Sequence, residues 1–222
     1  MKLCGKKIGF LGDSITFGVG TSNSENHYKG FRFPDLVSAR TGAVAYNYGI
    51  SGTRIAAQTV LLPFESESNH FSLRVDSMED DLDAVVVFGG TNDYGHGDAP
   101  LGDFSSREET TFYGALHLLI VKLLSKYPKA TLVFLTPFHR IDEGAGERFG
   151  VQKEPLKKYV DAIKEVCEYY SIPVLDLYAT GGIQPEIDVI RELYMPDGLH
   201  PSNLGAKRLA DRLSVMLENL MC

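Results

Sequence analysis

The segment from Lys7 to Thr16, KIGFLGDSIT, passes from an apolar run into a turn of small and polar residues. Its first half, Lys7–Leu11, has the composition of a short buried strand. Gly12, Asp13 and Ser14 follow directly. In a parallel sheet, residues just beyond a strand lie at the carboxyl edge, where ligands bind. The segment therefore predicts one element of the fold and a candidate functional residue at its end.

The same succession of an apolar run and a polar turn recurs along the chain. Two further runs end in turns of this kind, Gly49-Ile50-Ser51-Gly52-Thr53 and Gly89-Gly90-Thr91-Asn92-Asp93. If the strands are parallel neighbours, these turns meet at one rim of the sheet. Five strands are expected in all: Lys7–Leu11, Ala43–Tyr48, Ala84–Phe88, Thr131–Thr136 and Pro173–Leu177.

Helical spacing of apolar residues separates these runs. It is clearest over 112–127, 156–170 and 209–220, and weaker over 33–40 and 55–62. Pro155 suits the first turn of the second helix, and Ser105 with Glu108 predicts a capping box before the first. Strands that are apolar on both faces and alternate with helices predict an α/β fold, a parallel sheet covered on both sides. No repeat or linker divides residues 1–222, so we expect one domain.

Composition excludes several classes of protein. The 222 residues are 44% hydrophobic and 23% charged, ordinary values for a globular protein. A net charge of −7 argues against nucleic acid or an anionic membrane as the main partner. No stretch approaches the ~18 apolar residues that span a bilayer, and the N-terminus lacks the apolar run of a signal peptide. Three widely spaced cysteines indicate reduced thiols, so we expect a cytoplasmic protein. The oligomeric state is not encoded in these features.

The segment Asp197-Gly198-Leu199-His200-Pro201 supplies a carboxylate and an imidazole three residues apart. A tight turn at Gly198 would place Asp197 against one ring nitrogen of His200 and leave the other to face a serine. A histidine, whose ordinary pKa is about 6.5, suits a general base near neutral pH. Gly52 can present an unobstructed backbone N–H, and Asn92 can donate from its side chain. Acyl transfer needs these parts: a nucleophile, a base and donors for the oxyanion.

These blocks resemble those of the SGNH hydrolase superfamily, the GDSL-like lipases, acylhydrolases and esterases. Gly12-Asp13-Ser14 is similar to the first block, and the turns around Gly52 and Asn92 are similar to the glycine and asparagine blocks. The segment from Asp197 to His200 is similar to the Asp-x-x-His block. All four occur in the order of the superfamily, from residue 12 to residue 201.

The resemblance implies a flavodoxin-like three-layer α/β/α sandwich around a five-stranded parallel sheet. It implies that Ser14 is the nucleophile, His200 the general base and Asp197 the residue that orients it. The backbone N–H groups of Ser14 and Gly52 and the Asn92 side chain would form the oxyanion hole. No cofactor or metal is implied, and the substrate would be a small-molecule ester.

Other polar residues receive more modest roles. We interpret Asp13 and Asp93 as hydrogen-bond acceptors that brace their loops. His117 falls on the outer side of a predicted helix and is expected to be solvated, whereas His27 and His70 fall in polar loops. His96 and His139 follow the third and fourth strands, and we read neither as paired with a cysteine or carboxylate at metal-ligand spacing. Side chains expected to line the substrate pocket are Phe17, Tyr94, His96 and His139.

Two readings from other classes share the expected fold. A flavodoxin-like nucleotide- or flavin-binding module would use the loop Gly12–Gly20 but gives no role to Asp197 and His200. A phosphoryl-transfer enzyme would use Asp13, but its motif needs a second aspartate where Ile15 stands. Among ester hydrolases, polar and aromatic loops favour small O-acyl esters, with a carbohydrate O-acetyl esterase preferred over a lysophospholipase or thioesterase.

Overall fold

The central sheet has five parallel strands, as the sequence predicts, and their order is β2-β1-β3-β4-β7. It belongs to a computed structural model that describes residues 2–21, 31–58, 69–148 and 150–221. The strand order reverses beside β1, so the carboxyl ends of β1, β2 and β3 lie at the switch point, where ligands bind in sheets of this kind. The strands are β1 Lys7–Gly12, β2 Val44–Gly49, β3 Ala84–Phe88, β4 Thr131–Leu135 and β7 Val174–Leu175.

The inner strands β1, β3 and β4 are largely apolar on both faces because helices cover both faces. Every residue of β3 is buried, and its side chains alternate between two hydrophobic clusters. Val85 and Val87 belong to the cluster with Leu116 and Ile163, while Val86 and Phe88 belong to the other. A strand buried on both sides gains from β-branched residues at consecutive positions.

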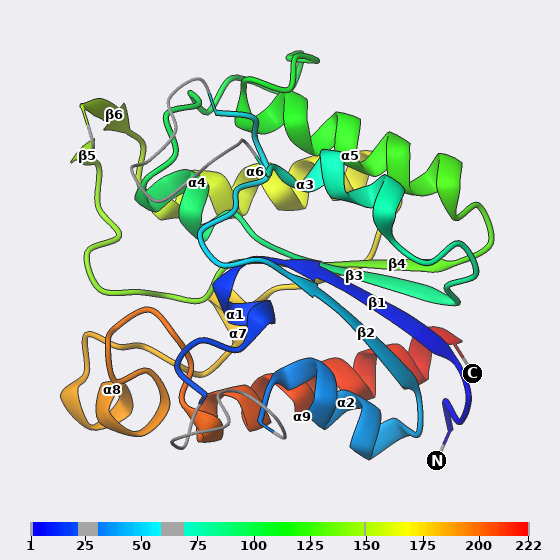
Figure 1. Cartoon of the computed structure of the whole chain (residues 1–222). Helices are drawn as coiled ribbons and strands as arrows, with labels where there is room; N and C mark the ends of the chain where they lie inside the picture. The colour runs from blue at the N-terminus through cyan, green and yellow to red at the C-terminus, as the bar shows by residue number, and fades with distance from the viewer. Residues whose placement is uncertain (1, 22–30, 59–68, 149, 222) are drawn as a thin grey trace.

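Helices form the two outer layers (Figure 1). On one face lie α5 and α6, with the short α3 and α4 at their side, and on the other lie α2 and α9. A small hairpin of β5 Gly146–Arg148 and β6 Val151–Lys153 extends from the first layer. The helices are α1 Ser14–Phe17, α2 Phe33–Thr41, α3 Phe71–Arg74, α4 Thr91–Gly95, α5 Phe112–Lys126, α6 Leu156–Tyr169, α7 Leu177–Thr180, α8 Asp188–Tyr194 and α9 Asn203–Met221, and a 3-10 turn over Val75–Ser77 follows α3.

The helix predicted over 55–62 is wrong where the structure describes it. Residues 55–58 are irregular, with a bend at 55 and 56, and residues 59–62 lie outside the described residues. The Asp93 carboxylate accepts hydrogen bonds from the backbone N–H groups of Ile55 and Ala56, at 3.0 and 2.9 Å. This long-range contact fixes the segment across the end of β3, whereas the apolar spacing alone indicates a helix.

The start of α5 also differs from the prediction. Thr111, not the predicted capping box of Ser105 and Glu108, caps the helix by accepting from the Gly114 N–H. Ser105 instead donates from its own N–H and hydroxyl to Asp103, an alternative that local side chains offer near helix starts.

The prediction that His117 is solvated is wrong. Its side chain is buried on α5 and bonds on both ring nitrogens, with Tyr170 Oη at 3.1 Å and the Phe104 carbonyl at 3.1 Å. The loop that carries Phe104 covers the face of α5 that periodicity assigns to solvent. Burial lowers the pKa of His117.

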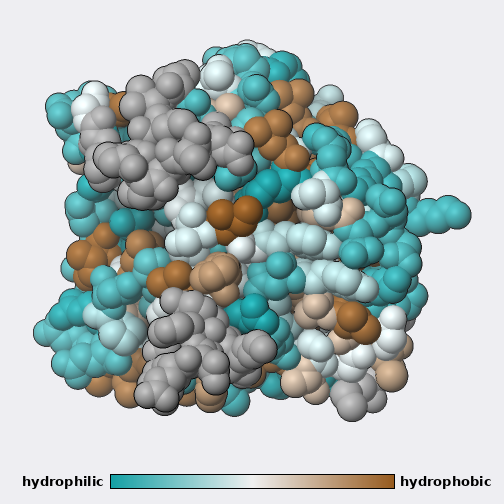
Figure 2. Space-filling view, viewed as in Figure 1, coloured by the Kyte–Doolittle hydropathy of each residue, from teal (hydrophilic) through white to brown (hydrophobic). Residues whose placement is uncertain are grey.

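The outer surface mixes polar and apolar residues. In Figure 2, hydrophilic residues cover most of the right-hand side of the face, and apolar residues form separate patches. Within the described ranges, no helix has the length and apolarity to cross a bilayer.

Candidate active site

Ser14 lies at the first position of α1, directly beyond β1. Asp13 fixes this turn, because its Oδ1 accepts a hydrogen bond from the Ile15 N–H at 2.9 Å. Gly12 admits the close return of the chain, since a Cβ there would lie 2.0 Å from Thr16 Oγ1. The serine side chain is therefore presented at the sheet edge by a turn with little freedom.

Ser14 and His200 are in contact although 186 positions separate them in the chain. Ser14 Oγ lies 3.0 Å from His200 Nε2. His200 Nδ1 lies 2.6 Å from Asp197 Oδ2. The predicted serine, histidine and aspartate thus form a continuous chain of hydrogen bonds, the arrangement by which an imidazole can remove the serine proton.

Two glycines allow close packing around the loop that carries Asp197 and His200. Gly198 has a φ of +76°, and a Cβ there would lie 2.4 Å from Ile141 Cγ1. Gly20 passes equally close to the other side, since its Cβ would lie 2.7 Å from His200 Cβ. From the sequence, Gly20 is only part of a loop, but its missing side chain makes room for the histidine.

Asp197 is ionised at neutral pH. Partial burial by itself would raise its pKa, but hydrogen bonds from His200 Nδ1 and from the backbone N–H groups of His200 and Leu199 outweigh burial. The pKa falls to about 2. A carboxylate in this state fixes Nδ1 as the protonated nitrogen and leaves Nε2 to accept a proton.

The three N–H donors predicted for an oxyanion hole each have a hydrogen that is not engaged by the described residues. Within the described part of the chain, the backbone N–H groups of Ser14 and Gly52 have no acceptor. The Asn92 side chain is buried, and Nδ2 donates one hydrogen to the Thr53 carbonyl at 3.0 Å. A primary amide carries two hydrogens, so one remains for a substrate.

Asp13 and Asp93 brace the loops beneath these groups. The Asp93 carboxylate accepts hydrogen bonds from the backbone N–H groups of Ile55 and Ala56, and the Asp13 carboxylate accepts one from that of Ile15. Burial raises the pKa of both carboxyls, that of Asp13 to about 7. Both contact backbone donors, in agreement with the structural role that the sequence indicates.

Arg74 is a residue of the site that the sequence does not identify. Its buried guanidinium donates to the carbonyls of Tyr48 at 2.6 Å and Gly12 at 3.1 Å, and to Thr53 Oγ1 at 3.1 Å. It thus joins the ends of β1 and β2 to the turn that contains Gly52. Burial lowers its pKa to about 10, so the cation persists at neutral pH.

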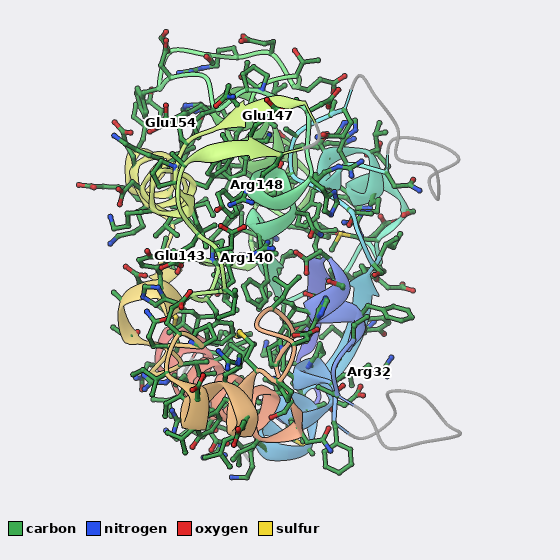
Figure 3. The ribbon with its side chains drawn as sticks, turned by 90° about the vertical axis from the view of Figure 1, so that its left-hand side faces the viewer. Arg32, Arg140, Glu143, Glu147, Arg148 and Glu154 are labelled. Carbon is green, nitrogen blue, oxygen red and sulfur yellow. The ribbon has the colours of Figure 1, made fainter. Side chains whose placement is uncertain are left out.

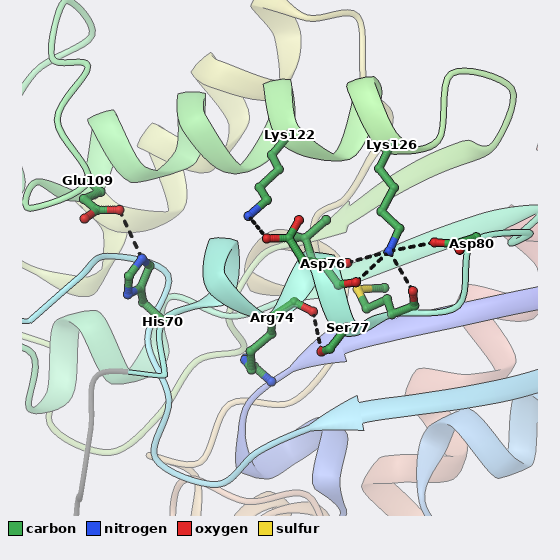
Figure 4. A network of polar contacts seen from close by, with 10 residues as sticks. His70, Arg74, Asp76, Ser77, Asp80, Glu109, Lys122 and Lys126 are labelled. Atoms are coloured by element: carbon green, nitrogen blue, oxygen red, sulfur yellow. Dashed lines mark hydrogen bonds and ion pairs between the residues drawn. The ribbon is translucent and has the colours of Figure 1, made fainter.

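A polar network fixes the segment that carries Arg74 against α5 (Figure 4). Lys122 pairs with Asp76 at 2.7 Å, and Lys126 Nζ donates to carbonyls of this segment, including Met78 at 2.7 Å. The Arg74 side chain points away from α5 toward the strands in this view. No local motif marks such an arginine, because its partners lie on distant segments.

The predicted pocket residues have different environments. Phe17, at the end of α1, is 40% exposed, and its role in a pocket stays a prediction. Tyr94 is fully buried, and its hydroxyl donates to the carbonyls of Asp142 and Gly144, so its prediction as a pocket residue is wrong. His96 Nδ1 lies 3.0 Å from Arg54 Nη1, and His139 Nδ1 lies 2.8 Å from Glu143. Tyr94 is drawn into the core by the loop that folds over α4.

The described residues also bear on the other predicted roles. His70, predicted in a polar loop, is buried and lies 3.2 Å from Glu109 Oε2, and His27 lies outside the described residues. Cys4 and Cys167 are free thiols, and Cys222 is not described. No group of three or more potential ligands that could hold a metal occurs among the described side chains.

The chain is similar to known proteins over most of its length. The model of the GDSL-like Lipase/Acylhydrolase family matches residues 10–208. One similar crystal structure is of a protein with 36% sequence identity; the match covers 99% of each chain, with a TM-score of 0.82. Another is of a protein from Lactobacillus plantarum with 30% identity; that match covers 97% of this chain and 98% of the other, with a TM-score of 0.80.

A carbohydrate acetylesterase from Sinorhizobium meliloti shares the fold at 19% identity, with a TM-score of 0.66 over 97% of this chain and 99% of its own. No curated protein matches the chain.

Proposed function

The chain belongs to the GDSL-like lipase/acylhydrolase family and is a hydrolase of ester bonds, and from this premise we propose that it cleaves small O-acyl esters through an acyl-enzyme on Ser14. The observation that carries the proposal is the chain of hydrogen bonds from Ser14 Oγ through His200 to Asp197. It links a nucleophile to a base, and the base to an ionised carboxylate.

In the proposed reaction, His200 Nε2 takes the Ser14 proton as Oγ attacks the ester carbonyl. The tetrahedral oxyanion accepts hydrogen bonds from the backbone N–H groups of Ser14 and Gly52 and from the remaining hydrogen of the Asn92 amide. The imidazolium, stabilised by Asp197, then protonates the leaving alcohol. Water attacks the acyl-enzyme with His200 again as base, and the acid leaves as Ser14 Oγ recovers its proton.

We further propose that the acyl group is short and the alcohol polar, with an acetylated sugar as the preferred case. Polar side chains at the rim support this: His139 and Glu143 follow β4, and Arg140 lies between them. Phe17 is exposed enough to pack against a sugar ring. The carbohydrate acetylesterase that shares the fold acts on substrates of this kind and adds to the support.

The test is kcat/KM for a series of p-nitrophenyl esters from acetyl to octanoyl, together with acetylated monosaccharides. A short-acyl site gives a maximum at acetyl or butyryl. An acyl tunnel would gain up to ~0.8 kcal/mol for each buried CH₂, so the rate constant would climb steeply with length. A maximum at octanoyl would refute the short-acyl proposal and favour a lysophospholipase or thioesterase.

A further inference from the structure

Arg140 follows β4, the strand next to the one that precedes Asn92. Its Nη1 donates to the Thr91 carbonyl and to Thr91 Oγ1, each at 3.2 Å. The next residue, Ile141, donates its backbone N–H to the Gly198 carbonyl at 2.9 Å. Arg140 therefore lies between the turn that holds Asn92 and the loop that holds Asp197 and His200.

The cation of Arg140 lacks a carboxylate partner in the described part of the chain. No carboxylate oxygen there lies within 4.0 Å of its guanidinium, Nη2 has no acceptor, and Nε is buried without one. The Cζ atom lies 5.5 Å from the centre of the Tyr94 ring, which covers one side of the group. A largely buried charge without a partner is costly, and buried charges in proteins are therefore usually paired.

The neighbouring charges are already engaged. Arg148 pairs with Asp142 at 2.7 Å, and Asp197 pairs with His200. The Glu143 carboxylate accepts from His139 Nδ1, from the Tyr178 hydroxyl and, at 3.4 Å, from the backbone N–H of Arg140 rather than from its guanidinium. In Figure 3, Arg140 lies near the middle of the face, with Arg148 above it and Glu143 beside it.

We infer that Arg140 is a subsite for a carboxylate of the substrate, so that the preferred ester carries a negative charge near the scissile bond. A carboxylate accepts charge-assisted hydrogen bonds from a guanidinium, and Nη2 supplies the donors here, because Nη1 is engaged by Thr91 and Nε is buried. The inference rests on the proposed function and adds the charge of the substrate to it. The carboxylate could belong to the acyl group or to the alcohol, as in a uronic acid.

Two matched pairs of esters test the inference and separate these sources. Monoethyl succinate against ethyl butyrate places the charge on the acyl side, and mono-O-acetyl methyl glucuronoside against the corresponding glucoside places it on the alcohol side. We expect kcat/KM for the charged member of at least one pair to be about tenfold to a hundredfold higher at low salt, the effect of a charge-assisted hydrogen bond. Equal values in both pairs would overturn the inference.

Variants assign the preference to Arg140. Arg140→Gln should abolish the ratio between charged and neutral esters, and Arg140→Lys should keep part of it. Arg212→Gln, which removes a charge on the exposed side of α9, should leave the ratio as it is. A ratio that survives in Arg140→Gln would overturn the assignment. If Arg140→Gln does not fold, the kcat/KM ratios of charged to neutral esters in the wild type still test whether the substrate carries a charge.

Binding separates this inference from the proposed reaction. Calorimetric titration of Ser14→Ala with methyl glucuronoside and methyl glucoside, and with monoethyl succinate and ethyl butyrate, needs no turnover. Tighter binding of a charged ligand, lost in the double variant with Arg140→Gln, supports the subsite even if no ester of the panel is hydrolysed. Equal binding of charged and neutral ligands overturns it even if the esters are cleaved.

Discussion

Asp197 holds His200 at two points, through ring and backbone. Its Oδ2 lies 2.6 Å from Nδ1 of the ring, and its Oδ1 lies 2.6 Å from the backbone nitrogen of the same histidine. The carboxylate thus fixes both the position of the residue and the direction of its ring. A single side chain, three residues away in the chain, therefore holds both the ring and the backbone of His200.

Asp197→Asn should lower kcat. The amide can still accept the backbone N–H groups with its oxygen, but it then presents hydrogens to Nδ1 and favours the wrong tautomer of His200. A loss of up to about 10⁴-fold, the value for the same change in serine proteases, is the upper bound. Steady-state kinetics on p-nitrophenyl acetate measures it, and an unchanged kcat would contradict the orienting role.

Ser14→Ala should lower kcat on an activated ester by roughly 10³-fold or more while the fold stays intact. A fluorophosphonate probe should label the wild type and Ser125→Ala, whose serine lies on the exposed side of α5, but not Ser14→Ala. Mass spectrometry of the labelled peptide identifies the serine. Labelling that persists in Ser14→Ala would show that another residue is the nucleophile.

Asn92→Ala should reduce kcat by about 10²–10³-fold with a much smaller change in KM, because one oxyanion donor acts mainly in the transition state. Asn219→Ala, which removes an exposed amide on α9, serves as the control and should keep wild-type kinetics. If Asn92→Ala changes mainly KM and not kcat, the residue binds the substrate in the ground state and its proposed role is wrong.

Arg74→Lys should lower kcat by as much as about 100-fold, because a single ammonium cannot hold Gly12, Tyr48 and Thr53 together and small displacements of reacting groups are costly. It should also cost about 1–3 kcal/mol in unfolding free energy, since buried carbonyls lose a donor. Lys126→Met serves as the control, because it removes a hydrogen bond to the segment that carries Arg74 but makes no contact with the site. We expect it to lower stability alone. Equal kcat values for the two variants would mean that Arg74 acts only on stability.

Asp13 should make the protein less stable as the pH rises from about 4 to 7. The folded-state pKa of about 7 exceeds the ordinary value of 3.8, so the folded state keeps a proton that the unfolded state has released. Stability is then fully present below pH 4 and falls by at most about 1.4 kcal/mol per pH unit up to pH 7. Asp13→Asn keeps the acceptor for the Ile15 N–H and should flatten this slope. Urea unfolding at several pH values measures it, and parallel curves for wild type and variant would refute the effect.

The sequence by itself determined the order of the strands along the chain and the residues at their ends. Lys7–Gly12 and Ala84–Phe88 are short, mostly apolar runs that are stabilised by burial. The turns that follow them consist of small and polar residues. Because parallel strands end at one rim, Ser14, Gly52 and Asn92 could be assigned to one site from local patterns. Asp197 and His200 could be paired because they are three residues apart.

Only the tertiary structure decided the environment of residues whose partners are far away in the chain. Arg74 contacts the carbonyl of Gly12, His117 is covered by the loop of Phe104, and Tyr94 is covered by the loop after β4. Periodicity reports which side of an element is apolar, but not which distant segment folds over the other side. Burial and pKa follow from that coverage, so they emerge only when the layers pack.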